Sequence, residues 1–224
     1  WTVRLFSFFC FFFVFFFFFF FFFKGASWAF GNDVFLNGAG NGVAFNPASN
    51  VWVAVGSSSN MVNVARSLDG RVWSPLASVF SVQGNAVAYS SQQQRWVAVG
   101  EGVFAIAYSL DNGQTWSGIG AVAGLFTVGR GVLFSQNSWI AFGSGGIQSG
   151  FSSNGVNWNA TVSANVFPSV ALGAAAGPSG CVLAVGDSSS VLASSCNGGL
   201  SFTAVPTFFP SGGAPTNTAV TGGP

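Results

Sequence analysis

Short apolar runs alternate with clusters of Gly, Ser, Asn and Pro along most of this chain. The most regular run ends in a glycine and occurs four times, at residues 51–56, 95–100, 138–143 and 181–186. Its closing glycines, Gly56, Gly100, Gly143 and Gly186, are separated by 44, 43 and 43 residues. Apolar runs of this length, bounded by turn-forming residues, predict β-strands.

A shorter apolar run precedes each of these strands, and an alternating run follows it. The preceding runs are residues 42–45, 85–89, 131–134 and 172–176, and residues 104–109 are an example of the following type. Outside the first 23 residues, no window of comparable length has the apolar spacing of an amphipathic helix. We therefore expect an all-β chain whose repeats each supply four consecutive strands, named A to D in chain order.

A polar motif, S-x-[D/N]-x-G-x-[S/T]-[W/F], stands between strands C and D of each repeat. Full-length copies occupy residues 109–116 and 195–202, copies shorter by one residue occupy 67–73 and 152–158, and residues 25–28 are a half copy. The closing aromatic residues are 45, 43, 42 and 44 residues apart. Because this interval is the length of one four-stranded propeller blade, the sequence predicts a β-propeller of four-stranded antiparallel blades, with about four blades present.

The motifs resemble the Asp-box, or BNR repeat, of the sialidase-like propeller superfamily, over roughly residues 25–209. That superfamily includes sialidases, some xyloglucan-degrading glycosidases, sortilin-type receptors and photosystem II assembly-factor propellers. The resemblance implies that an Asp or Asn accepts backbone N–H groups in the C–D hairpin, that glycine takes a positive φ and that the aromatic residue packs between blades. It therefore implies a structural role for Ser67, Asp69, Gly70, Trp73, Ser109, Asp111, Gly113, Thr115, Trp116, Asn154, Gly155, Trp158, Asn197, Gly199 and Phe202.

The repeats also divide the chain. We expect a phenylalanine-rich segment over residues 1–24, propeller blades over 25–209 and a Gly/Pro/Thr-rich linker or tail over 210–224. Closed propellers of the resembled superfamily usually contain more than four blades. The resemblance therefore implies that this sequence is a fragment of a larger propeller.

The first segment has three interpretations. Residues 5–23 contain 15 phenylalanines, nine of them consecutive, with no charge between Arg4 and Lys24. As a helix they would span roughly 28 Å, which fits a signal peptide or a membrane anchor and would make a membrane one of the partners. The few interruptions are residue types one base change from the phenylalanine codon TTT, which favours a translated intron end with its splice acceptor. A structural segment is the third interpretation.

Composition excludes several kinds of chemistry. Only 5% of the residues are charged, and the chain has no histidine. Ser-His-Asp and Cys-His catalysis are therefore excluded, the commonest transition-metal ligand is missing, and we expect no metal site and no cofactor. From Gly25 onward five acidic residues face four basic ones without a basic stripe. We therefore expect no nucleic-acid partner.

Two cysteines of the last repeat bear on the compartment. If strands B and C pair with Val185 opposite about Val191, Cys181 faces residue 195 or 196, and one register step allows a disulfide with Cys196. Two buried free thiols are the alternative. Together with the sequon at residues 159–161, a disulfide favours an extracellular or cell-surface location.

In a propeller, the B–C and D–A connections lie opposite the Asp-box turns and usually carry the ligand. The charged candidates there are Glu101, Arg130 and Asp187. A sialidase needs three arginines, a Tyr–Glu nucleophile pair and an Asp acid/base, and these candidates do not supply that set. The Phe/Tyr-Arg-Ile-Pro signature of sialidases is also absent.

The sequence therefore favours a non-catalytic scaffold that presents Ser-, Gly- and Asn-rich loops to a protein or glycan partner. A fragment of a sialidase-like or other glycoside hydrolase, with its catalytic residues in further blades, is one alternative. A propeller similar to the photosystem II assembly factors is another, and it rests on analogy of fold alone.

Overall fold

A computed structural model describes residues 34–120, 122, 124–162, 166–167, 169–187 and 192–205. The chain divides into two compact units, Trp1–Asn32 and Asp33–Pro224, and all described residues belong to the second. The phenylalanine-rich segment, the half motif at residues 25–28 and the tail over 210–224 lie outside the described residues.

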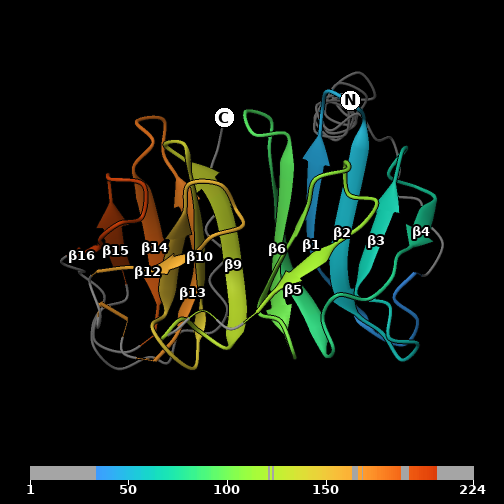
Figure 1. Ribbon diagram of the computed structural model, residues 1–224, viewed down its shortest axis with the longest axis horizontal. Coiled ribbons are helices and arrows are strands. Elements are labelled where there is room, and N and C mark those ends of the chain that lie inside the picture. Colours follow the sequence, from blue (N-terminus) through green and yellow to red (C-terminus); the bar gives the residue numbers. More distant parts are fainter. Residues whose placement is uncertain are drawn as a thin grey trace, which may run out of the picture. The chain divides into compact units, whose positions relative to one another are not determined.

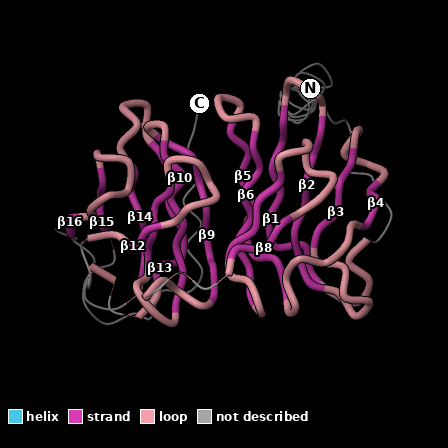
Figure 2. The backbone as a smooth tube through the Cα atoms, viewed as in Figure 1, coloured by secondary structure: helices cyan, strands magenta, loops and turns pink. Residues whose placement is uncertain are grey.

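All regular secondary structure of the described residues is β, as Figure 2 shows. The first blade contains β1 (Ala39–Asn46), β2 (Val51–Ser57), β3 (Val64–Ser67) and β4 (Trp73–Pro75), and the second contains β5 (Gln83–Ser90), β6 (Arg95–Glu101), β7 (Ile106–Ser109) and β8 (Ser117–Ile119). The third contains β9 (Val128–Ser135), β10 (Ser138–Ser144), β11 (Ser149–Ser152) and β12 (Asn159–Ala160), and the fourth contains β13 (Ala171–Ala176), β14 (Val182–Gly186), β15 (Leu192–Ser195) and β16 (Thr203–Ala204). No helix of the described part is long and apolar enough to cross a membrane.

Each blade is an antiparallel sheet in which consecutive strands pair, so the predicted order A-B-C-D is confirmed. The first strands of successive blades contact one another: β1 contacts β5, β5 contacts β9 and β9 contacts β13. In Figure 1 the first two blades lie in the right half of the view and the last two in the left half, with β4 and β16 toward opposite ends. Because β3 and β15 run toward the upper edge of that view, the C–D hairpins that follow them lie there.

The A strands are longer than the apolar pattern predicted. β1 and β9 begin three residues before the predicted run, and β5 begins two residues before it. The reason is that strand pairing continues past a bulge. The residue left unpaired at each bulge is Asn41, Asn85, Arg130 or Leu172, at the same position in all four blades. Glycine and polar residues around three of the bulges hid this part of the strand from the hydrophobic pattern.

The apolar core consists of three clusters, each shared by two neighbouring blades. The first cluster joins Val53 and Val55 of β2 with Val87 of β5 and Trp96 of β6. The other two join the second blade to the third and the third to the fourth in the same way. Because apolar burial is the largest favourable term in folding, packing between blades stabilises the molecule more than packing within one thin sheet does.

Candidate functional site

The hairpins between strands C and D form one edge of the blades, which we call the box rim. In the first blade, Ser67 Oγ donates to Asp69 Oδ1 at 3.0 Å and accepts the Gly70 amide at 2.9 Å. Asp69 Oδ1 also accepts the amides of Arg71 and Val72, both at 2.8 Å. The third blade repeats this geometry with an amide oxygen, since Asn154 Oδ1 accepts two backbone amides at 2.9 and 2.8 Å.

The two full-length motifs accommodate their extra residue with a second left-handed backbone conformation. Asn112 and Gly113 have φ values of 60° and 79°, and Gly198 and Gly199 have 69° and 83°. The short motif of the first blade has one such residue, Gly70, at 72°. Asp111 Oδ1 still accepts two amides, from Gln114 at 3.0 Å and Thr115 at 2.9 Å. The extra residue therefore leaves the acceptor role unchanged.

Both box aspartates are used within their own hairpins. Hydrogen bonds from the amides of Val72 and Arg71 lower the pKa of Asp69 below its ordinary value. Burial alone would raise the pKa of Asp111, but hydrogen bonds from Thr115, Ser109 and the Gln114 amide outweigh burial and lower that pKa to about 2. Carboxylates that are held ionised by turn amides suit a bracing role and not proton transfer.

In the second, third and fourth blades, the glycine of the C–D hairpin packs against strand B of the preceding blade. An added Cβ on Gly113 would lie 2.7 Å from Val53 Cγ2, and on Gly199 it would lie 2.7 Å from Ile140 Cγ1. On Gly155 it would lie 3.0 Å from Val97 Cγ2. The motif aromatics join the same contacts, because Trp116, Trp158 and Phe202 each belong to a different inter-blade cluster.

Polar contacts extend these joints, the contacts between one blade and the next, to the A–B turn of the preceding blade. Asn112 accepts Asn46 Nδ2 at 3.0 Å and donates to Ser49 Oγ at 2.8 Å. At the next joint Gln93 Nε2 donates to the Ser153 carbonyl at 2.8 Å. At the third, Gln136 Oε1 accepts the Gly198 amide at 2.9 Å. Sequence reasoning missed these partners, because their side-chain types differ from blade to blade.

The opposite edge, formed by the B–C and D–A connections, is called the pocket rim here. Glu101 ends β6, and Gln83 Nε2 donates to its Oε2 at 3.5 Å. Arg130 is the exposed bulge residue of β9. Asp187 follows β14 and accepts the Val170 amide at 2.9 Å and the Ser169 hydroxyl. The three candidates therefore belong to the second, third and fourth blades and each has a different local setting.

Asp187 differs from the ordinary solvated carboxylate that its Gly and Ser neighbours in the sequence predict. Burial would raise the pKa of Asp187, but hydrogen bonds from Ser169 and the Val170 amide outweigh burial and lower it. The carboxylate therefore fastens the connection between β12 and β13 to the end of β14, which the flanking residues gave no means of predicting.

Buried phenylalanines support the pocket rim, and sequence reasoning missed them. Phe80, Phe126 and Phe167 lie in the D–A connections and are at most 4% exposed. A Cβ on the strand-B glycine Gly100 would lie 2.8 Å from Phe80, and one on Gly143 would lie 2.5 Å from Phe126. The rings therefore require glycine at these positions near the ends of strands B. One phenylalanine before each A strand was the available signal.

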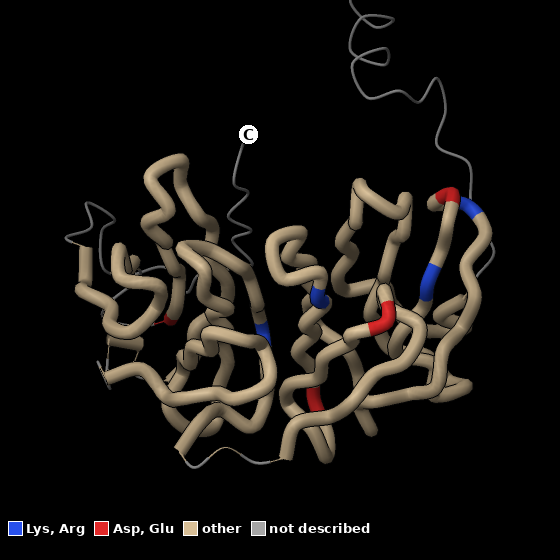
Figure 3. Tube along the Cα trace, turned by 45° about the horizontal axis from the view of Figure 1, so that its top comes forward, with Lys and Arg blue, Asp and Glu red and all other residues tan. Residues whose placement is uncertain are grey.

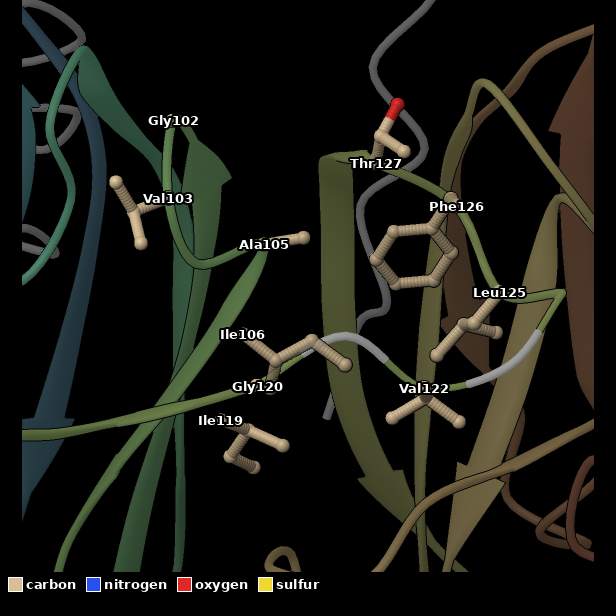
Figure 4. Close-up of a pocket in the computed structure, with 10 residues that line it drawn as sticks. All are labelled: Gly102, Val103, Ala105, Ile106, Ile119, Gly120, Val122, Leu125, Phe126 and Thr127. Atoms are coloured by element: carbon tan, nitrogen blue, oxygen red, sulfur yellow. The ribbon is translucent and has the colours of Figure 1, made fainter.

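Between the second and third blades the pocket rim contains a cavity of about 110 Å³. Figure 4 shows the side chains around it, and they are almost all apolar. Ile106, Leu125 and Phe126 are buried, with exposed fractions of 3%, 7% and 4%, whereas Val103 is 74% exposed. The other lining residues are Gly102, Ala105, Ile119, Gly120, Val122 and Thr127.

Exposed aliphatic residues continue from this cavity toward the first blade. Val82 is 57% exposed and Met61 is 76% exposed. Hydrogen bonds through backbone groups and serine hydroxyls hold their loops together: the Val103 amide donates to Ser81 Oγ at 2.9 Å, the Val82 amide donates to the Glu101 carbonyl at 3.1 Å, and Ser78 Oγ donates to the Met61 carbonyl. Met61, Val82, Val103 and the cavity are together called the aliphatic patch.

Cys181 and Cys196 form a disulfide with their Cα atoms 4.2 Å apart. The register that permits it places Val182 opposite Ser195 and Val185 opposite Leu192, one residue beyond the expected Val191.

Figure 3 shows the charged residues dispersed over the blades. In the described part of the chain, no group of three or more His, Cys, Asp or Glu side chains could hold a metal ion.

No family model and no curated protein matches this chain. Solved structures do match its fold. YCF48 from Cyanidioschyzon merolae is 20% identical, with 77% of this chain and 58% of that chain covered and a TM-score of 0.56. A GH74 enzyme from Niastella koreensis is 21% identical, with 75% and 24% covered and a TM-score of 0.52. A catalytically inactive virginiamycin B lyase from Staphylococcus aureus is 10% identical, with 78% and 57% covered and a TM-score of 0.61.

This chain thus spans less than two thirds of the length of each of those proteins. Identities this low carry information about architecture and not about ligands, and one propeller fold serves many functions. The sheet order, the joints between blades and these neighbours together show that the chain has a β-propeller fold.

Proposed function

We propose that this protein is a non-catalytic propeller scaffold that binds a partner protein through the pocket rim. The observation that carries the proposal is the aliphatic patch. Its three exposed side chains and its cavity are solvent-accessible apolar surface on connections that hydrogen bonds hold together. Exposed apolar side chains on adjoining loops are typical of interaction sites.

The cavity has the size of a side-chain pocket. At about 110 Å³ it is far larger than the roughly 10–15 Å³ that a single water molecule needs. It is smaller than the roughly 300–1,000 Å³ of pockets that enclose whole small molecules. It therefore suits one aliphatic side chain of a partner, with Val82 and Met61 contacting the neighbouring residues of that partner.

The same lining favours a protein over a glycan. Sugar hydroxyls lose their hydrogen bonds to water on binding and need polar groups in exchange. Thr127 has the only polar side chain among the described residues that line the cavity. Apolar side chains from a partner protein gain roughly 25 cal/mol for each Å² removed from water and need no such exchange.

The carboxylates of the pocket rim support a non-catalytic role. Glycoside hydrolysis uses two carboxyl groups roughly 5–10 Å apart on either side of the scissile bond. Glu101 and Asp187 are separated by the whole third blade, and Asp187 already accepts hydrogen bonds from Ser169 and Val170. The hydrolase alternative would therefore depend on residues that the described blades do not contain.

The proposal includes an extracellular or cell-surface location. It is supported by the Cys181–Cys196 disulfide, because such bonds persist in oxidising compartments. Thiol alkylation of the natively produced protein with and without prior reduction would test it. Alkylation of Cys181 and Cys196 without reduction would contradict an oxidising location.

A peptide selection tests the binding function. The full chain, immobilised in mild detergent, is used to select a displayed library of random peptides, and the recovered peptides are measured against two variants. Val103→Asp places a charge at the mouth of the cavity, whereas Val162→Asp changes a valine of equal exposure, 75% against 74%, in a connection beyond the third blade. We expect peptides with a shared aliphatic residue whose affinity falls about tenfold in Val103→Asp and stays unchanged in Val162→Asp.

Equal affinity for the two variants would overturn the proposed site. A separate assay tests the absence of catalysis, using fluorogenic sialosides and β-glucan oligosaccharides. Turnover that disappears in Glu101→Gln or Asp187→Asn would contradict the non-catalytic role, whether or not peptides bind.

A further inference from the structure

A carboxylate lies within the aliphatic patch. Glu101 ends β6 and is half-buried, and the next residue, Gly102, lines the cavity. Glu101 also pairs with Val128, whose neighbour Thr127 lines the cavity. Figure 4 shows Gly102 and Thr127 toward the same end of the cavity. On its other side, the Glu101 carbonyl accepts the Val82 amide at 3.1 Å. Glu101 therefore stands between the cavity and an exposed aliphatic residue of the patch.

The corresponding acid of the fourth blade shows what Glu101 does not do. Asp187 occupies the same position, directly after the strand-B glycine. There the amide before strand A, that of Val170, donates to the Asp187 carboxylate at 2.9 Å. In the second blade the corresponding amide, that of Val82, donates to the backbone carbonyl of Glu101. The connection to strand A therefore leaves the Glu101 carboxylate unused.

The other contacts of this carboxylate are weak. Among the described residues, its one hydrogen bond comes from Gln83 Nε2 at 3.5 Å, longer than the roughly 2.7–3.2 Å of ordinary bonds. Arg130 belongs to the same rim as the exposed bulge residue of β9, and no ion pair joins it to Glu101 in the described structure. The carboxylate therefore depends on water for the rest of its hydrogen bonding.

A partner that covers the aliphatic patch also removes this water. Desolvation of an ionised carboxylate costs free energy unless another group takes the place of the water. A Lys or Arg of the partner would do so with a charge-assisted hydrogen bond, whereas an acidic residue would be repelled. The charge of Glu101 therefore discriminates among partners that the apolar surface alone would accept.

We propose, on the basis of the binding function proposed above, that Glu101 selects partner segments in which a Lys or Arg accompanies the aliphatic residue that enters the cavity. The cavity, Glu101 and Val82 follow one another across the patch. A segment laid across them presents an aliphatic residue, a basic residue and a second aliphatic residue in that order. Because an extended segment advances roughly 3.3 Å per residue, the basic residue stands within about four positions of the first aliphatic one.

Peptides selected on the full chain from the displayed random library test this pattern. We expect Lys or Arg within about four positions of the shared aliphatic residue, more often than in the unselected library. Glu101→Gln should weaken binding of these peptides about threefold to tenfold, because a partly exposed ion pair is lost. Asp187→Asn is the matched control, since it makes the same change of charge at the same position of another blade, and it should leave their affinity unchanged. No enrichment of basic residues, or equal affinity of Glu101→Gln and the unmodified protein, would overturn the inference.

An exchange of charge distinguishes an ion pair from a structural role of Glu101. Glu101→Lys should bind a selected peptide about tenfold more weakly than the unmodified protein does, and should regain affinity when Glu replaces the basic residue of that peptide. Added salt should weaken binding by the unmodified protein more than binding by Glu101→Gln, because salt screens the charges. A lack of recovery in the exchanged pair would contradict the inference.

Val103→Asp separates this inference from the function on which it rests. Peptides that lose affinity in Val103→Asp but have no preference for a basic residue would leave the binding site in place and overturn the role of Glu101 alone. Peptides that are indifferent to both Val103→Asp and Glu101→Gln would overturn both proposals.

Discussion

The two rims of this propeller hold the blades together by different means. On the box rim, side chains do the bonding: an Asp or Asn accepts the turn amides in every blade, and a glycine contacts the preceding blade at three joints. On the pocket rim, backbone pairs join the blades, beside side-chain bonds from Asn41 Nδ2 to the Gly84 carbonyl and from Asn85 Nδ2 to the Gly129 carbonyl. Glu101 of the second blade pairs with Val128 of the third, and Ser144 of the third blade pairs with Val170, which directly precedes β13 of the fourth.

This difference explains where the sequence repeats and where it varies. Side-chain bonding fixes residue types, so the box motif recurs with a nearly constant period. Backbone bonding leaves the side chain unspecified, so the residue after the strand-B glycine is Ser57, Glu101, Ser144 or Asp187. Variation is therefore tolerated on the pocket rim, and this is where a propeller can acquire a binding surface without loss of stability.

The largest expected effect distinguishes a box glycine that contacts the preceding blade from a box glycine that serves its own turn alone. Gly113→Ala places a Cβ 2.7 Å from Val53 at a positive φ of 79°. Gly70→Ala has the same backbone problem at 72° but nothing closer than 3.6 Å. We expect Gly70→Ala to lower the free energy of unfolding by about 1–2 kcal/mol through backbone strain, and Gly113→Ala by about 2–4 kcal/mol because overpacking adds to it.

Urea unfolding of the two variants measures the difference, with Gly173→Ala as the control, since a Cβ there has no neighbour within 4 Å and φ is not positive. Equal losses in Gly113→Ala and Gly70→Ala would mean that box glycines serve the turn alone and that the joint does not depend on close approach.

The next effect separates the two rims. Asp111→Ala removes the acceptor of the Gln114 and Thr115 amides and should lower the free energy of unfolding by about 1–3 kcal/mol. Asp111→Asn keeps a side-chain oxygen as the acceptor, as Asn154 and Asn197 do in their hairpins. Its loss of unfolding free energy should therefore be smaller. Peptide binding at the pocket rim should be unchanged in both variants. A melting temperature for Asp111→Ala equal to that of the unmodified protein would contradict the bracing role.

Most of the fold could be predicted from the sequence, because its determinants repeat. The strand-B glycines and the box aromatics each mark the blade period, and both follow from local packing needs that every blade shares. The bulges at Asn41, Asn85, Arg130 and Leu172 could not be predicted, since a bulge depends on strand pairing and only the first two positions share a residue type. The one-residue difference in the Val185–Leu192 register has the same cause.

The candidate site was less predictable. Sequence reasoning selected charged residues, Glu101, Arg130 and Asp187, because charge signals chemistry. The aliphatic patch was missed, since Met61, Val82 and Val103 are ordinary apolar residues until the fold exposes them. Only the contacts between the B–C and D–A connections bring these residues onto one surface, and those contacts run through backbone carbonyls and serine hydroxyls that have no sequence signature.

The smallest expected effect uses pH to distinguish the acidic boxes from the amide boxes. The pKa of Asp111 is lowered to about 2, so its folded form gains stability that is fully present above its ordinary pKa of 3.8 and is lost as the pH falls through about 2. Asn154 and Asn197 do not titrate, so their hairpins should keep their strength in acid. Asp111→Asn should therefore reduce the loss of unfolding free energy between pH 5 and pH 2.5 by about 1 kcal/mol, after allowance for solvent screening of a partly exposed group. Urea midpoints at the two pH values measure this difference. If the variant and the unmodified protein lose equal stability, the acidic box gains nothing from its charge, and the carboxylate and the amide are equivalent acceptors.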